Sequence, residues 1–184
     1  MTRPWERPST GTAAERVAAL AAHIPVLETG HLRLRAPRIG DFPIYARFAL
    51  DKPERDETAW LDFCQMVAGW TLRGYGPWTV ERKDGGDPVG AIIINHEYGD
   101  PEAEIGWVAA HAAEGRGFVT EAARAARGHA FSALGFDTLV SYIAPDNARS
   151  VAVAERFGAI RDHKAEAVFD EPIRVYRHHR EARA

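Results

Sequence analysis

The stretch Glu114-Gly115-Arg116-Gly117-Phe118-Val119-Thr120-Glu121-Ala122 joins a Gly-x-Gly turn directly to a long alanine-rich segment. Glycine has no Cβ, so the backbone of such a turn can approach a ligand closely. The first turn of the following helix carries free N–H groups and a partial positive charge, which together suit a phosphate or pyrophosphate. A strand-to-helix turn that binds nothing could have the same sequence, and this stretch alone does not separate the two interpretations.

The segments before this turn favour strands. Strands are predicted at 77–82, 89–95 and 103–109, with turn signals between them. Ile92, Ile93 and Ile94 form an apolar run, which indicates a central strand buried on both faces. The order predicts an antiparallel meander, followed by a helix at 119–134 whose small residues allow close packing on a sheet.

The remaining pattern predicts an α+β domain, with a central mixed, mostly antiparallel sheet flanked by helices. Residues 1–25 are expected to form an N-terminal arm with a short helix, and residues 26–184 a single domain. His178 and His179 lie among arginines and are expected in a solvated tail. Further elements are expected as a helix at 13–23, a strand at 31–35, helices at 41–50 and 57–73, a strand at 138–143, a helix at 147–157, and strands at 159–163 and 173–177.

Composition and charge argue against several classes of protein. The chain has 184 residues, of which 46% are apolar and 27% charged, as in an ordinary folded domain. Its net charge of -3 argues against nucleic-acid binding. Cys64 is the single cysteine, and no apolar run has membrane-spanning length. The histidines show no metal-ligand spacing. We expect a cytoplasmic protein that uses no metal, membrane or nucleic acid.

Two common phosphate-binding motifs do not fit. A P-loop needs Gly-Lys-Ser/Thr, which the chain lacks. A dinucleotide-binding fingerprint needs a third small residue and a parallel strand-helix-strand unit. Here that place is Thr120, and the preceding strands are predicted to be antiparallel.

A second motif lies downstream, where Pro145-Asp146-Asn147-Ala148-Arg149-Ser150 is followed by Phe157-Gly158. Together with Ala103–Trp107 and Gly115–Ala122, in this order and at these spacings, it makes the chain resemble the GNAT superfamily of acetyl-CoA-dependent N-acetyltransferases over residues 28–178. More narrowly, the chain resembles the RimJ/RimL-like branch, named for enzymes that acetylate N-termini of ribosomal proteins. The resemblance implies the GNAT fold and direct transfer of an acetyl group from acetyl-CoA to a primary amine in a ternary complex.

The same resemblance implies where coenzyme A is held. The Gly-rich turn binds the pyrophosphate, and the pantetheine arm runs between the strands at 103–109 and 138–143, where a bulge in the first strand frees backbone groups. The Asn147 amide binds the arm. Glu114 stands where the family usually has Arg or Gln, and Val119 where it usually has Gly or Ala; the Glu114 carboxylate is expected to point away from the phosphates. The implied cofactor-binding residues are Trp107, Val108, Ala109, Glu114, Gly115, Arg116, Gly117, Phe118, Val119, Thr120, Asn147 and Ser150.

Catalysis needs a base for the incoming amine and a proton or hydrogen bond for the departing thiolate. Many GNAT members use a Tyr as the acid, and here that place is Ala154. The resemblance points to Ser150 instead, with Tyr142 and Ser141 as alternatives, although a serine in a first helical turn often bonds only the backbone. Glu104 is the expected base, because burial beside apolar neighbours would raise its pKa. A carboxylate on an exposed strand face is the other interpretation of Glu104.

The resemblance places the acceptor groove between residues 41–76 and the loop at 164–172. Aromatic and acidic side chains near the first segment suit a cationic small amine or a peptide N-terminus, although core aromatics and a solvated helix face would explain them too. A second copy of the chain, forming a homodimer, is a further candidate partner. The alternative function is a non-catalytic acyl-CoA-binding or regulatory module on the same fold. The side chains concerned are Trp60, Phe63, Trp70, Tyr75, Trp78, Asp51, Glu54, Asp56, Glu57 and Asp62.

Overall fold

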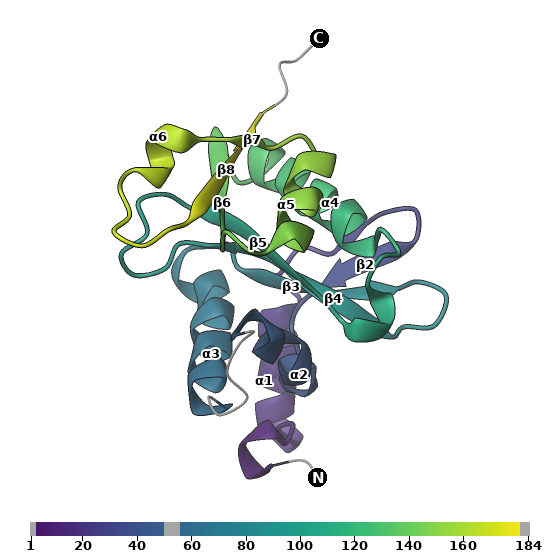
Figure 1. Cartoon of the computed structure of the whole chain (residues 1–184). Helices are drawn as coiled ribbons and strands as arrows, with labels where there is room; N and C mark the ends of the chain where they lie inside the picture. Colours follow the sequence, from purple (N-terminus) through teal and green to yellow (C-terminus); the bar gives the residue numbers. More distant parts are fainter. Residues whose placement is uncertain (1–2, 50–55, 181–184) are drawn as a thin grey trace.

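The computed structural model describes residues 3–49 and 56–180 and is built on one eight-stranded sheet with the order β1-β2-β3-β4-β5-β6-β8-β7 (Figure 1). Neighbouring strands are antiparallel except β5 and β6, which are parallel. The predicted mixed, mostly antiparallel sheet is therefore confirmed. The strands are β1 (Leu27–Glu28), β2 (Leu32–Arg35), β3 (Pro77–Arg82), β4 (Pro88–Asn95), β5 (Glu104–Ala109), β6 (Thr138–Ile143), β7 (Ile160–Arg161) and β8 (Arg174–His179).

Helices cover both faces of the sheet. The first face is covered by α4 (Phe118–Ser132) and α5 (Ala148–Arg156), and the second by α2 (Phe42–Tyr45) and α3 (Asp56–Leu72) (Figure 1). Ile92 and Ile94 are buried under the alanines of α4, whereas Ile93 is buried with Phe42 and Phe63 on the other face. The central strand β4 is thus buried on both sides, as its apolar run predicts.

The segment predicted as a helix at 41–50 forms short turns instead, namely η2 (Ile39–Asp41), α2 and η3 (Ala46–Ala49), and its last predicted residue lies outside the described part. Asp41, expected to cap a helix, is buried. Its carboxylate accepts hydrogen bonds from the Arg35 guanidinium (2.7 and 3.1 Å) and from Thr79 Oγ1 (2.8 Å). A buried carboxylate needs such partners, and these tie the turns to β2 and β3.

The C-terminal part departs from the prediction in two ways. The strand expected at 159–163 shortens to β7, because the Asp162 carboxylate accepts hydrogen bonds from two N–H groups of the next turn (both 3.1 Å) and starts α6 (His163–Glu166). The prediction of a solvated tail is wrong for His178. β8 pairs with β6 as far as His179, so the side chain of His178 is 0% exposed while that of its neighbour His179 faces solvent. The period of two simply continues past residue 177.

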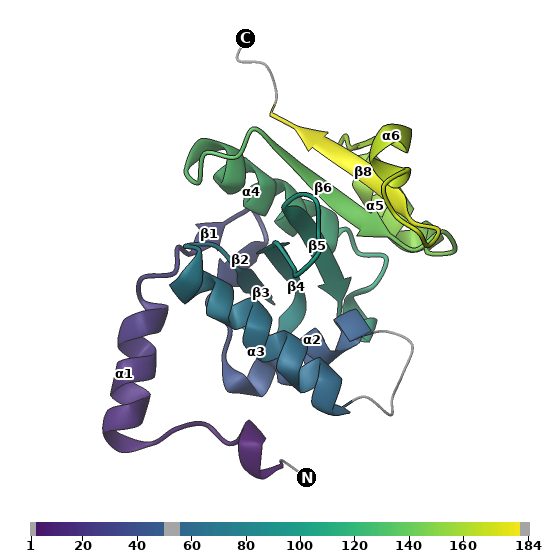
Figure 2. The same ribbon diagram turned by 90° about the vertical axis from the view of Figure 1, so that its left-hand side faces the viewer.

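The N-terminal helix α1 (Gly11–Ala21) stands apart from the sheet in Figure 2, and none of its residues is buried. Val17 and Leu20, expected to share one side of this helix, are both exposed. That the first 25 residues form an arm outside a single domain remains a prediction. Among the helices that the structure describes, none is long and apolar enough to cross a membrane.

Candidate active site

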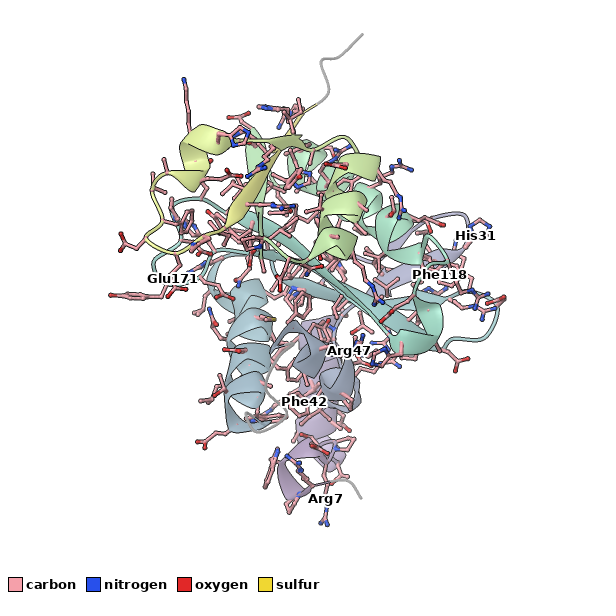
Figure 3. The ribbon with its side chains drawn as sticks, viewed as in Figure 1. Arg7, His31, Phe42, Arg47, Phe118 and Glu171 are labelled. Atoms are coloured by element: carbon pink, nitrogen blue, oxygen red, sulfur yellow. The ribbon has the colours of Figure 1, made fainter. Side chains whose placement is uncertain are left out.

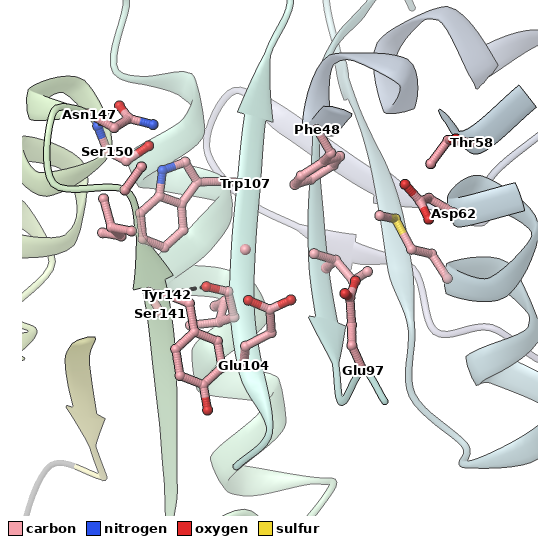
Figure 4. Close-up of a pocket in the computed structure, with 16 residues that line it drawn as sticks. Phe48, Thr58, Asp62, Glu97, Glu104, Trp107, Ser141, Tyr142, Asn147 and Ser150 are labelled. Carbon is pink, nitrogen blue, oxygen red and sulfur yellow. Dashed lines mark hydrogen bonds between the residues drawn. The ribbon is translucent and has the colours of Figure 1, made fainter. Parts of the chain in front are cut away.

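A cavity of ≈ 550 Å³ opens where β5 and β6 diverge. Along the described strands, their ladder is confined to Glu104 opposite Val140, and Val140 N–H donates to the carbonyl of Ala103 (3.1 Å). Ser141 Oγ then donates to the carbonyl of Ile105 (2.6 Å) at the vertex of the gap. Because the strands separate beyond this point, their facing side chains form the cavity walls, as the close-up shows (Figure 4).

The bulge expected in the strand at 103–109 is absent from the described pairing of β4 with β5. Its register runs unbroken from Glu104 opposite Asn95 to Ala109 opposite Gly90. The divergence of β6 instead leaves β5 without a ladder partner on that side beyond Glu104. Farther along β5, Arg47 Nε donates to the carbonyl of Ala109 (2.7 Å).

The Gly-x-Gly turn precedes α4 as predicted. Gly115 and Gly117 adopt left-handed backbone conformations, with φ of +73° and +80°, and a Cβ at either would meet nothing within 4 Å. Glycine is therefore required by the backbone conformation rather than by crowding. Gly117 caps α4 without a side-chain hydrogen bond, so the first N–H groups of the helix have no side-chain cap. The guanidinium of Arg116 lies over the ring of Phe118 (5.0 Å). This geometry fits an anion such as a diphosphate.

Glu114 connects both sides of the gap. Its carboxylate accepts hydrogen bonds from Arg47 Nη2 (3.0 Å), from Arg149 Nη1 (2.8 Å) and from the ring of His111 (3.1 Å). Arg47 belongs to η3, beside α2 (Figure 3), and Arg149 to the first turn of α5. The unusual acid at the start of the loop is therefore neutralised by two arginines, which lie close to where the phosphates are predicted.

Asn147 and Ser150 lie together beside Trp107 (Figure 4). The side-chain oxygen of Asn147 accepts a hydrogen bond from the N–H of Ser150 (3.0 Å), so Asn147 is the N-cap of α5. This leaves the amide NH₂ of Asn147 for another partner. Both side chains line the cavity with Trp107, whereas Val108 is buried against α2 and α3 and can offer a ligand only its backbone. Thr120 and Val119 follow in the first turn of α4 and pack inward.

Three carboxylates, of Asp62, Glu97 and Glu104, line the cavity toward its other end (Figure 4). Burial raises the pKa of Glu104 to about 8, and the nearby charges of Glu97 and Asp100 add to the increase. Burial also raises the pKa of Glu97, with Asp100 and Asp62 contributing. No lysine, arginine or histidine occurs among the described residues that line the cavity. The cavity therefore favours a positively charged ligand.

Sequence reasoning missed Glu97. The residue lies two positions after the end of β4 and continues the two-residue alternation of Ile93 and Asn95, which was the available signal. Asn95 Nδ2 donates to Glu97 Oε1 (3.0 Å), which fixes the carboxylate in place.

The hydroxyl of Tyr142 is held away from the centre of the cavity. It is within 3.3 Å of both the carbonyl and the N–H of Glu102, and its ring packs edge-on against Phe169 at 5.3 Å. Burial raises the pKa of Tyr142 to about 12. Ser141 is also engaged, since it bonds Ile105 and the ring of His178 (2.9 Å). Ser150 is thus the candidate acid whose hydroxyl faces the cavity most directly.

Fewer of the predicted aromatic and acidic side chains line the cavity than expected. Among the described side chains of the aromatic and acidic set, Asp62 is the one that lines the cavity, together with Phe48, Thr58 and Met66 of the same region. The side chain of Glu57 is exposed. The side chains of Asp51, Glu54 and Asp56 are not among those that the structure describes. The aromatic residues pack in the two cores instead, because large apolar rings gain most from full burial: Trp60, Phe63, Trp70, Tyr75 and Trp78.

Comparison with known proteins agrees with this geometry. Residues 31–160 match the family model of the acetyltransferase (GNAT) domain. The chain belongs to the GNAT family. It is similar to YkkB, an uncharacterized protein of Bacillus subtilis (strain 168), with 30% identity over 129 residues that cover 68% of this chain and 72% of YkkB.

Solved structures also resemble this GNAT protein. An acetyltransferase from Agrobacterium tumefaciens str. C58 is 39% identical and has a TM-score of 0.78, covering 85% of this chain and 95% of its own. A GNAT-family protein from Bordetella pertussis is 25% identical with a TM-score of 0.66, covering 83% and 98%. The predicted GNAT fold is confirmed, and the protein is an acetyltransferase.

Proposed function

We propose that this GNAT protein transfers an acetyl group from acetyl-CoA directly to a primary amine that reaches the cavity as a cation. The observation that carries the proposal is the cavity between β5 and β6, which has Asn147 and Ser150 in one wall and three carboxylates in another. A thioester and an ammonium group could meet there next to a base, as direct transfer in a ternary complex requires.

The residues around the Gly-x-Gly turn suit acetyl-CoA, which supplies the acetyl thioester. The N–H groups from Gly115 to Thr120 would hold the diphosphate at the start of α4. The backbone of Trp107 to Ala109 and the free amide of Asn147 would pair with the pantetheine arm. No sequence motif for a metal is needed in this scheme.

Glu104 is the proposed base. An acceptor amine is protonated at neutral pH and must lose a proton before its nitrogen attacks the carbonyl carbon. Burial raises the pKa of Glu104 to about 8, so the carboxylate can take up that proton near physiological pH. As the carbon–sulfur bond breaks, the hydroxyl of Ser150 donates a hydrogen bond to the departing sulfur. Ala154 is fully buried at the place of the usual tyrosine, so it provides no competing group.

The acceptor class follows from the charge of the cavity. Two solved proteins that share the fold act on different amines by name: a ribosomal L7/L12 alpha-N-protein acetyltransferase, 19% identical, and a spermidine N-acetyltransferase, 16% identical. Both act on amines, and at these identities they support the fold alone. We propose a small cationic amine or a basic peptide N-terminus, because Asp62 and Glu97 can hold a second positive group while Glu104 receives the first.

The proposal is tested by release of free thiol from acetyl-CoA across a panel of diamines, polyamines and peptides with basic second residues. Wild-type protein is compared with Glu104→Gln and Ser150→Ala. We expect release with cationic acceptors, a large loss in Glu104→Gln and a smaller loss in Ser150→Ala. If the protein binds CoA but no acceptor raises thiol release, the proposal fails and the non-catalytic acyl-CoA-binding alternative takes its place.

A further inference from the structure

A second cavity, of ≈ 650 Å³, lies where the C-terminal parts of α4 and α5 meet the end of β8, close to the C-terminal end of the described chain (Figure 1). It shares no lining residue with the active site. We call it the arginine groove. It is lined by Arg124, Arg127, Gly128, Phe131, Ser132, Arg156, Phe157, Gly158, His179 and Arg180.

The arginine groove is strongly cationic although the whole chain carries a net charge of -3. Four of its lining residues are arginines, two from α4, one from α5 and one directly after β8, and a histidine adjoins them. None of the described residues that line it is acidic. Arginine keeps its charge at any physiological pH, so burial or clustering cannot neutralise these groups as it neutralises a carboxylate.

Backbone carbonyls hold three of the four arginines in place. Arg124 Nη2 donates to the carbonyl of Arg156 (2.6 Å), and Arg180 Nη2 donates to the carbonyl of Phe136 (3.0 Å). Arg127 donates to the carbonyl of Phe157 and lies over its ring at 5.2 Å. A guanidinium has five N–H donors in a fixed fork, so a contact to one carbonyl, or to the two of Phe131 and Phe136 in the case of Arg180, orients the fork and leaves other donors for a ligand. Such pre-oriented forks suit the paired oxygens of phosphate.

Gly128 provides an independent observation. It lies within α4, is exposed in the groove, and has an ordinary helical backbone conformation. A Cβ at this position would meet nothing within 4 Å, so no packing inside the protein requires glycine. Glycine within a helix weakens that helix relative to alanine, which α4 uses freely elsewhere. The missing side chain leaves the helix backbone open to a ligand at this position of the groove.

We propose that the arginine groove is a binding site for a small anion with adjacent phosphate groups, of the size of pyrophosphate or a nucleoside diphosphate. The site is separate from the Gly-x-Gly loop, because Gly128 lies ten residues after Phe118, which corresponds to about 15 Å along a helix. The proposal does not depend on acetyl-CoA binding. Arg124, Arg156 and Arg180 supply the charge, and Gly128 supplies the space.

Calorimetry with inorganic pyrophosphate and with ADP tests the site. The double variant Arg124→Gln/Arg156→Gln should weaken pyrophosphate binding at least about tenfold, because each removes hydrogen bonds to a charged partner. It should leave CoA affinity unchanged. Arg7→Gln/Arg16→Gln is the matched control, since it removes two exposed charges from the N-terminal region. Gly117→Asp, which alters only the cofactor loop, should retain pyrophosphate binding.

Gly128→Ala separates binding from folding. Alanine should raise the thermal midpoint through its better helix propensity, while pyrophosphate affinity falls several-fold because a methyl group occupies the space beside the helix backbone. Absence of pyrophosphate binding would overturn the proposal, and so would binding that Gly117→Asp removes but Arg124→Gln/Arg156→Gln does not. Tighter binding of citrate, or of a single-stranded RNA oligonucleotide, than of ADP at the same arginines would also overturn it.

Discussion

The acidic cavity and the arginine groove are similar in size and opposite in charge, and they control that charge in different ways. Glu104 and Glu97 have no cation beside them within the described lining, and burial raises the pKa of both so that each can reduce its charge by taking up a proton. The arginines of the groove cannot lose theirs, and carbonyl groups orient Arg124, Arg127 and Arg180 instead. The cavity should therefore respond to pH, and the groove to salt.

The largest effect is expected from a substitution in the acidic cavity, the active-site cavity lined by Asp62, Glu97 and Glu104. Glu104→Gln removes the proposed base, and general-base catalysis typically contributes on the order of 10²- to 10⁴-fold, so kcat/KM should fall by about 10³-fold. In wild type, the rate should rise with pH through about 8, because the carboxylate must be deprotonated to act. Initial rates from pH 6 to 10 measure both effects.

Glu97→Gln is the matched control for that experiment. It should keep the rising limb but move it to lower pH, since the charge of Glu97 helps to raise the pKa of Glu104. An unchanged pH profile in Glu104→Gln would rule out Glu104 as the titrating group.

The second-largest effect concerns the Gly-x-Gly loop. This loop would bind an anion through backbone N–H groups rather than through guanidinium groups. Gly117→Asp should lower CoA affinity by about two orders of magnitude, because like charges placed together cost several kcal/mol. The backbone at Gly117 has φ of +80°, which also strains most side chains. Gly117→Asn tolerates that conformation without the charge and should lose much less affinity. Equal losses in the two variants, by calorimetry, would show that charge is not the cause.

A smaller effect of opposite sign is expected from Glu114→Gln. The carboxylate holds Arg47 and Arg149 close to the predicted phosphate site, and its loss frees both for an anion. CoA affinity should rise about three- to tenfold, as expected for exposed charges that are partly screened. Glu15→Gln, an exposed change on α1, is the control. Weaker CoA binding in Glu114→Gln would mean that the contacts of Glu114 with Arg47 and Arg149 stabilise the phosphate site rather than compete with the phosphates for these arginines.

The smallest effect concerns stability. A carboxyl with a raised pKa in the folded state contributes most to stability below its unfolded pKa, and that contribution is lost as the pH rises through about 8. Glu104→Gln should therefore raise the thermal midpoint at pH 9 by a few degrees, about 2–4 °C for each kcal/mol recovered, and change it little at pH 4. Thermal unfolding at both values measures the difference, and equal shifts would contradict a buried charge at Glu104.

The sequence predicts the fold well because its signals are local. The period of two in the meander, the alanines of α4 and the glycines before it each report one element, and their order decides the topology. The candidate site is predicted less completely. The divergence of β5 from β6 and the bridge through Glu114 bring together residues that are far apart in the chain, and no local pattern encodes such distances.

His178 and Glu97 illustrate the same limit. His178 is buried because β8 continues by two residues, and Glu97 lines the cavity although it lies two residues beyond the end of β4. The arginines of the groove are unremarkable in the sequence, and only the meeting of α4, α5 and β8 gathers them.

The ring of Phe157 lies between the active-site wall and the arginine groove. Its ring stacks on His178 (4.7 Å), meets Trp107 of the active-site wall edge-on (5.4 Å), and forms part of the arginine groove. A ligand in the active site would contact Trp107 and an anion in the groove would contact Phe157, so coupling between the two ligands would pass through the contact between these rings. By thermodynamic reciprocity, whatever factor an anion in the groove imposes on CoA affinity, CoA must impose on the anion. Replacing Phe157 would therefore change such a coupling without removing a lining residue of the active site.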